Sequence, residues 1–193
     1  MTINATVSIT QDDLFTALGG FITSLGFLNP VAVAPATVPV EVVRLPVNRA
    51  AMPALAFISM SPATQTRLAT NRSNYPPNTG APGSIVVPDN FASTMNTQVD
   101  VQIDCYGSTS GDWAQILCNL LRSAYACDWF LANAGFDITP LYADDPHQIP
   151  LVDGEQQYEE RWTFNCALQS NPTVTLPQQY AKVVGPVSIT DVL

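Results

Sequence analysis

The sequence predicts a single α+β domain, because two stretches alternate like half-buried strands and the stretch between them has the spacing of an amphipathic helix. Residues 97–106 and 158–168 place apolar side chains at every second position, which gives each strand one dry and one wet face. Residues 113–131 place theirs three and four apart. A dry strand face and a helix stripe cover each other, so two layers should enclose one core within residues 1–193.

The composition favours a subunit partly covered by copies of itself or by neighbours over a neutral-polar monomer. Only 12% of the residues are charged, against about 25% in ordinary soluble domains. Residues 1–72 contain four arginines against three acids, whereas residues 73–193 contain three basic residues against thirteen acids. The net charge of −9 opposes binding to nucleic acid or an anionic membrane. We find no leader and no membrane-spanning run, and expect a cytoplasmic protein.

The first helix is predicted directly after Thr10, which forms a near-capping box with Asp13, and Gly26 is a suitable stop. Gly19 and Gly20 either weaken the middle of this helix or allow another backbone to approach closely. The apolar stripe consists of Leu14, Ala17, Leu18, Phe21, Ile22 and Leu25.

Two short strands bounded by prolines are predicted next, at residues 40–45 and 54–60, and they can pair with each other. Residues 65–71 fit a helical turn or a short strand. From 72 to 96 the sequence is rich in proline and lacks periodicity, which is uncommon inside a compact domain. Because aromatic residues in it can anchor contacts, we predict an extended arm or hairpin that orders on contact with a partner.

The central helix is predicted as one continuous element of about five turns. Gly107 ends the strand before it, and Thr109 with Asp112 forms a near-capping box. We expect its stripe to pack on the dry faces of the two long strands. The stripe consists of Trp113, Ile116, Leu117, Leu120, Ala124, Cys127 and Leu131.

The remaining elements are short strands and turns. Residues 136–142 fit a short strand that Pro140 either confines to a sheet edge or ends. Asp153 and Gly154 predict a turn, and residues 171–177 alternate again. None of the four cysteines forms a CxxC pair, so we expect small core residues in a reducing compartment rather than disulfides or zinc ligands.

Two groups of side chains could carry chemistry. Asp144, Asp145 and His147 in one loop could bind a metal, but loop carboxylates followed by proline more often form a solvated turn. Asp100 and Asp104 share the wet face of one long strand, and Glu159 and Arg161 share that of the other. Two carboxylates on one face could perform acid–base chemistry, or an arginine and a carboxylate could form a cross-strand pair. We favour the turn and the ion pair. With one histidine and no nucleophile or phosphate-binding motif, no enzyme, catalytic residue, metal or cofactor is expected.

Four blocks of the sequence resemble the phage neck (tail) terminator proteins. They occur in the family's order: the helix that begins at Asp13 and Leu14, VDVQIDCYG at 99–107, YADDP at 142–146 and GEQQYEERW at 154–162. The resemblance implies a ring, usually a hexamer, at the head-proximal end of a phage tail. Such rings stop growth of the tail tube and meet the head connector or neck protein. It also implies a mixed, mostly antiparallel sheet with helices on one face, and a virion protein assembled in the host cytoplasm without catalytic residues.

Two other functions stay open from the sequence: a connector or baseplate adaptor, and a small metal-dependent hydrolase built on the 144–147 loop. For assembly, we expect contacts from the proline-rich arm, from the 144–147 loop and from basic residues of the first part of the chain. The candidate interface residues are Tyr75, Pro76, Pro77, Phe91, Asp144, Asp145, His147, Arg49 and Arg72.

Overall fold

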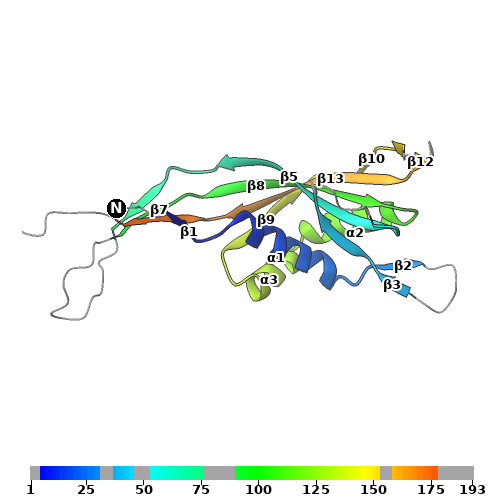
Figure 1. Cartoon of the computed structure of the whole chain (residues 1–193), viewed down its shortest axis with the longest axis horizontal. Helices are drawn as coiled ribbons and strands as arrows, with labels where there is room; N and C mark the ends of the chain where they lie inside the picture. The colour runs from blue at the N-terminus through cyan, green and yellow to red at the C-terminus, as the bar shows by residue number, and fades with distance from the viewer. Residues whose placement is uncertain (1–4, 31–36, 46–52, 76–89, 153–157, 178–193) are drawn as a thin grey trace, which may run out of the picture.

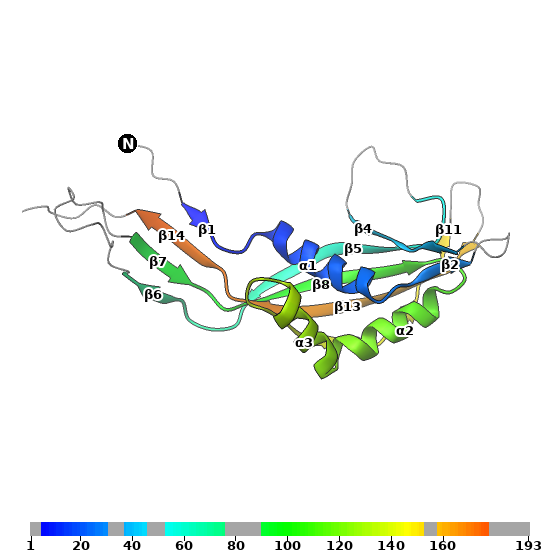
Figure 2. The ribbon, with the colours of Figure 1, turned by 90° about the horizontal axis from the view of Figure 1, so that it is seen from below.

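The molecule is elongated, with a helical layer on one face of a central sheet and a narrower β-sheet that extends from one end (Figures 1 and 2). This α+β arrangement, with the helices on one face, is the predicted fold class. The computed structural model describes residues 5–30, 37–45, 53–75, 90–152 and 158–177.

The central sheet is mixed and mostly antiparallel, as expected. Its strands are β4 (Glu41–Arg44), β5 (Phe57–Arg67), β8 (Thr97–Tyr106), β9 (Ile138–Ala143), β10 (His147–Gln148) and β13 (Arg161–Ser170). The order is β10–β13–β8–β5–β4, and β9 also pairs with the outer edge of β13. The predicted pairing between the 40–45 and 54–60 regions is confirmed, and its direction is parallel. Pro140 lies in edge strand β9, also as predicted.

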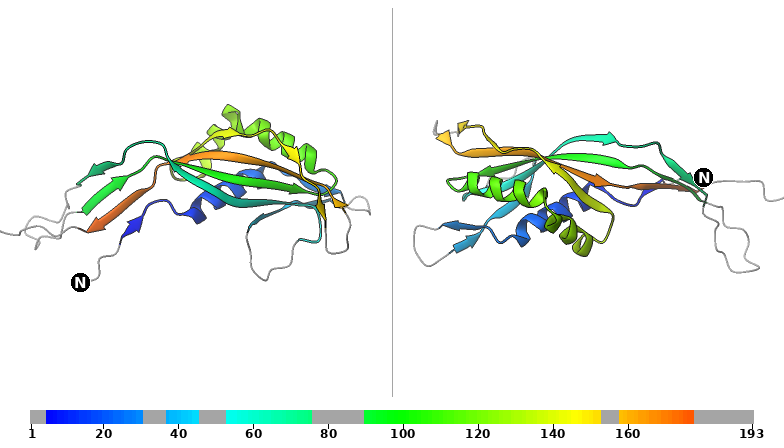
Figure 3. Two further views of the ribbon diagram at one scale, coloured as in Figure 1. Left: turned by 90° about the horizontal axis from the view of Figure 1, so that it is seen from above. Right: turned by 180° about the vertical axis from the view of Figure 1, so that it is seen from behind.

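One face of this sheet forms the core with three helices, while no described helix covers the opposite face (Figure 3). The helices are α1 (Gln11–Ser24), α2 (Ser110–Leu121) and α3 (Ala124–Asn133). The alternation predicted for the long strands is confirmed on the helix side. The buried strand residues there are Val99, Val101, Ile103, Cys105, Phe164, Cys166 and Leu168. They join the buried residues of all three helices in a single hydrophobic cluster.

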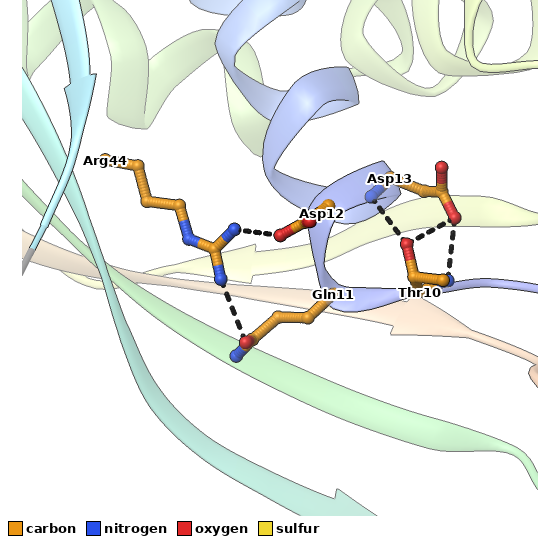
Figure 4. A network of polar contacts seen from close by, with 5 residues as sticks. All are labelled: Thr10, Gln11, Asp12, Asp13 and Arg44. Carbon is orange, nitrogen blue, oxygen red and sulfur yellow. Dashed lines mark hydrogen bonds and ion pairs between the residues drawn. The ribbon is translucent and has the colours of Figure 1, made fainter.

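The start of α1 is held by the predicted capping box (Figure 4). The Asp13 amide donates to Thr10 Oγ1 at 3.2 Å, and Asp13 Oδ2 accepts from the Thr10 amide and hydroxyl at 2.7 Å each. These hydrogen bonds stabilise the ionised carboxylate and lower the pKa of Asp13. Arg44 donates to Asp12 and Gln11, which ties strand β4 to the first turn of the helix (Figure 4).

The paired glycines of α1 permit close approach by side chains rather than by another backbone. A Cβ at Gly19 would lie 3.2 Å from Met60 Cε, and one at Gly20 would lie 3.3 Å from the Trp129 ring. The two positions therefore let β5 and α3 pack tightly against the middle of α1.

The prediction of one continuous central helix is wrong, and so is its near-capping box of Thr109 with Asp112, because the Thr109 side chain forms no capping hydrogen bond at the start of α2. The chain forms α2 and α3 with a break at Arg122 and Ser123, where Ser123 Oγ donates to the Leu120 carbonyl at 2.6 Å. The buried positions change phase at this break. In α2 they are Ser110, Trp113, Ala114, Leu117, Cys118 and Leu121, and in α3 they are Ala126 and Phe130. Ile116, Ala124 and Leu131, predicted to be core residues, are exposed instead.

The three long strands continue past the core into a second sheet, which we call the β-arm. It consists of β1 (Thr6–Val7), β14 (Thr173–Pro177), β7 (Asn90–Thr94) and β6 (Arg72–Asn74), in that order. Backbone hydrogen bonds cross the junction, from Leu68 to Asn96 and from Met95 to Pro172. None of the arm strands contributes a buried side chain. The proline-rich 76–89 segment lies outside the described residues, so the predicted proline-rich arm of residues 72–96 stays a prediction.

Two small hairpins complete the described chain. β2 (Leu28–Pro30) pairs with β3 (Thr37–Pro39), and β11 (Leu151–Val152) pairs with β12 (Tyr158–Glu159). The second hairpin brackets the predicted Asp153–Gly154 turn, which itself lies outside the described residues. For residues 65–71, the strand alternative is confirmed as far as Arg67, where β5 ends.

The phase change predicts opposite outcomes for two leucines of the apolar pattern. Leu117 is 0% exposed and Leu131 is 85% exposed. Leu117→Ala should lower the free energy of unfolding by roughly 2–5 kcal/mol, because it leaves a cavity. The matched control, Leu131→Ala, should change it by less than about 0.5 kcal/mol. Urea unfolding of the dilute subunit measures both, and equal losses would contradict the assignment of the buried face.

The capping box predicts a pH-dependent contribution from Thr10. In the unfolded chain Asp13 has a pKa near 3.8, and in the folded chain its pKa is lower. The ionised carboxylate therefore stabilises the fold above that value, and the contribution is lost as the pH falls through the folded-state pKa. Thr10→Ala should melt at a lower temperature than wild type at neutral pH, and the gap should narrow in acid. Thermal melts followed by circular dichroism test this, with Thr66→Ala on the exposed part of β5 as control.

Candidate interaction surface

The described end of the β-arm brings the two predicted aromatic anchors together. The Tyr75 and Phe91 rings lie 5.5 Å apart between centroids, and Tyr75 is 61% exposed. Strands β6 and β7 pair antiparallel, with Arg72 opposite Thr94, so Arg72 lies on the same pair of strands, three residues before Tyr75. Arg72 is exposed. Three other candidate interface residues, Arg49, Pro76 and Pro77, lie outside the described residues.

The loop after β9 is fastened to the C-terminus of α2. Arg122 donates from Nε to the Ala143 carbonyl and from Nη2 to Asp145 Oδ1, both at 2.7 Å. Asn165 Nδ2 donates to Asp144 Oδ2 at 3.1 Å, and Cys118 Sγ donates to the Asp144 carbonyl at 3.2 Å. These contacts give both carboxylates structural partners.

His147 has a separate position from the two aspartates, on the short edge strand β10. It pairs with Thr163 and is exposed. Within the described part of the chain, no group of three or more histidine, cysteine, aspartate or glutamate residues is placed to hold a metal ion. The geometry of the loop is that of a braced turn with an exposed edge.

The wet faces of β8 and β13 contain the predicted cross-strand ion pair. Arg161 Nη2 and Nε donate to Asp104 Oδ1 at 2.9 and 3.2 Å, and Gln102 Nε2 donates to both oxygens of the same carboxylate. Asp104 was expected on a solvated face but is 2% exposed. Neighbouring side chains shield Asp104 from water in the folded sheet. The rings of Tyr106 and Phe57 stack with their centroids 4.4 Å apart, and the Arg161 guanidinium lies over the Tyr106 ring.

The ion pair acts on stability rather than on proton transfer. Burial, followed by the charge of Asp104, raises the pKa of Tyr106, so that this phenol stays neutral. Asp100, the other carboxylate of the face, accepts from Thr64 Oγ1 at 2.5 Å and from Gln98 Nε2 at 2.7 Å. Each carboxylate is thus held by neighbouring donors on the sheet, as a structural residue would be.

Several apolar residues of α2 and α3 that were predicted to lie in the core lie on the surface instead. Ile116 and Leu131 are exposed, as is Ala124, and Cys127 is half-buried. The signal that could have revealed this is Ser123, a residue that favours helix termini over helix interiors. A helix break there changes which apolar residues face the sheet.

A family profile described as phage neck terminator protein matches residues 12–192. The chain belongs to this family. It follows that the protein is a non-enzymatic structural component of the phage tail, located in the virion, and that it associates with tail-tube and neck components. The hydrolase alternative is thereby excluded. No curated protein matches the sequence.

No helix among the described residues has the length and the apolar character needed to cross a membrane. The family profile confirms the family that the sequence blocks resemble. The mixed, mostly antiparallel sheet with helices on one face confirms the predicted fold class. The candidate interface residues stay predictions.

The buried ion pair predicts a large cost for removing one partner. Arg161→Met should lower the free energy of unfolding by roughly 3–5 kcal/mol, because it leaves the Asp104 carboxylate buried without a counter-charge. The Arg122–Asp145 pair provides the control, since the Asp145 side chain is 88% exposed, and Asp145→Ala should shift the urea midpoint little. If the two variants lose similar stability, Asp104 is solvated in solution.

Proposed function

We propose that copies of this chain form a closed ring, of six subunits, at the head-proximal end of a phage tail. The ring stops growth of the tail tube and provides the surface that joins the tail to the head. Its partners are further copies of itself, the tail-tube protein and the head connector or neck protein. Membership of the neck terminator family supports the terminator role, and the resemblance of the sequence blocks suggests six subunits.

The observation that carries this proposal is the β-arm. Strands β6, β7 and β14 continue β5, β8 and β13 beyond the last residues that the helices cover (Figure 2). A sheet without a buried side chain gains little from its own packing. Such an extension is best explained as a surface that becomes covered when another subunit or particle component binds it.

The distribution of charge supports contact between unlike patches of neighbouring copies. A closed ring requires heterologous contacts, in which one patch of a subunit meets a different patch of the next. The first 72 residues are slightly basic and the remainder is acidic. Because only 12% of residues are charged, burying these patches removes few ions from water and so has a low desolvation cost.

The direct test is the assembly state of the purified protein. Light scattering after size exclusion should give a mass near six subunits, and negative-stain electron microscopy should show closed rings. Immunogold labelling of intact particles should place the protein at the neck. A monomer at every concentration, together with label along the tube or at the distal tip, would contradict the proposal and favour an adaptor role.

Removal of residues 76–87 should separate folding from assembly. We expect this deletion, closed with a short glycine linker, to keep the melting temperature within a few degrees of wild type, because it removes none of the paired residues of β6 and β7. Ring formation, or joining of the tail to the head, should be lost. Complementation of a phage lacking the protein measures the yield of infectious particles. Normal rings and normal yield from the deleted protein would show the segment to be dispensable.

A further inference from the structure

Apolar side chains lie exposed or half-buried on both α2 and α3. We define the helix stripe as Ile116, Ala124, Cys127 and Leu131 together with Asp112 and Asp128. Ile116 and Leu131 are 43% and 85% exposed. Asp112 lies one turn before Ile116, and Asp128 lies one turn after Ala124 and three residues before Leu131, so each carboxylate shares a helix face with the apolar residues.

The stripe combines apolar area with negative charge. Within the described residues, neither Asp112 nor Asp128 forms an ion pair. A ligand suited to this surface therefore needs apolar or aromatic side chains beside cationic groups. Arginine and tyrosine are among the residues most enriched in protein interfaces.

The β-arm, together with the end of β5 that leads into it, carries that combination. Arg67 ends β5 and Arg72 begins β6, both are exposed, and among the described residues neither forms an ion pair. The exposed ring of Tyr75 follows directly and packs on Phe91. The strand pair of the arm and the end of β5 that leads into it thus offer two exposed positive charges and an aromatic pair.

The arm and the helix stripe do not meet within one chain. In Figures 1 and 2 the arm strands point away from α2 and α3 at one end of the molecule, and the arm strands pack mainly on one another. Two complementary surfaces that belong to one chain and are separated in it are the requirement for a heterologous contact between copies.

We propose that the β-arm of one subunit docks on the helix stripe of the next subunit in the ring. Arg67 and Arg72 face Asp112 and Asp128, and the Tyr75–Phe91 pair covers Ile116 and Leu131. The occupant of the stripe is thus a second copy of this chain. The inference rests on the proposed ring and specifies which two surfaces close it.

Charge reversal tests the pairing of the two surfaces. Asp128→Arg should weaken subunit association roughly tenfold or more, because it places like charges opposite each other. Adding Asp112→Arg, Arg67→Asp and Arg72→Asp in the same chain reverses every charge of the proposed contact and should restore association, measured by sedimentation velocity across a dilution series. The matched control is Glu41→Arg, the same charge change at an exposed position on edge strand β4. Equal effects of Asp128→Arg and Glu41→Arg, or no recovery in the combined variant, overturn the proposed pairing.

A thiol cross-link gives a second, independent readout. Burial raises the pKa of Cys105, Cys118 and Cys166 and protects these thiols, whereas Cys127 lies half-buried in the helix stripe. Ser73→Cys puts a thiol on exposed strand β6 of the arm. With a short bis-maleimide, this variant should give covalent dimers, trimers and larger multiples on a denaturing gel, and adding Cys127→Ser should abolish them.

The outcomes separate this inference from the ring itself. If rings form but these cross-links do not, and Asp128→Arg behaves as Glu41→Arg does, the proposed pairing of the β-arm with the helix stripe is wrong. The proposed function is not affected by that result. If the helix stripe instead binds purified tail-tube or connector protein while rings form normally, the occupant is that partner and the inference is wrong. Absence of rings from the wild-type protein under all conditions defeats the proposed function first.

Discussion

Strand β8 is paired along its whole length on both sides, and the positions of the other elements depend on this double pairing. Every residue from Thr97 to Tyr106 has a partner on β13. All of them except Tyr106 also have a partner on β5, although one bulge shifts the register of that pairing. Because side chains alternate between the faces of a strand, a slip of one residue would turn the apolar row of β8 outward. The Asp104–Arg161 ion pair can form only in the observed register of β8 and β13, so it helps to specify that register.

The break between α2 and α3 allows the helical layer to follow two different supports. α2 packs on β13 and β8 of the sheet through Trp113 and Leu117, whereas α3 turns to pack on β9 and α1. Phe21 of α1 lies 5.3 Å from Phe130 and 5.4 Å from Trp129, measured between ring centroids. A straight helix would have buried Leu131 in place of its neighbour Phe130. The choice of Phe130 for the core leaves an apolar side chain on the surface, and the proposed contact between copies uses it.

The features that were predictable from the sequence are those encoded by residues close in the chain. The alternation of β8 and β13, the capping box of Thr10 with Asp13 and the edge position of Pro140 each depend on a few consecutive positions. The helix break was missed because the same apolar residues fit two phases, and only packing against α1 decides between them. The parallel direction of β4 was not predictable, since a short apolar run carries no information on direction.

The candidate surface also contains some features that the sequence predicts and others that it does not. Tyr75 and Phe91 were predicted to be anchors because they are aromatic residues in a region without periodicity, and their rings pack on each other. The burial of Asp104 depends on Tyr106, Phe57 and Arg161, which come together only in the folded sheet, so a period-two pattern placed it in water. The helix stripe was hidden because its residues were assigned to the core.

The order of the strands also governs when the subunit can fold during synthesis. β8 lies in the middle of the sheet, but its second neighbour, β13, is among the last described strands to leave the ribosome, and β1 at the start of the chain pairs with β14 near its end. Pairings this distant in sequence are slow to form. Until residue 170 has been made, one edge of β8 stays open and able to pair with another chain. Each nascent chain therefore passes through a vulnerable interval, which ends when β13 pairs with β8.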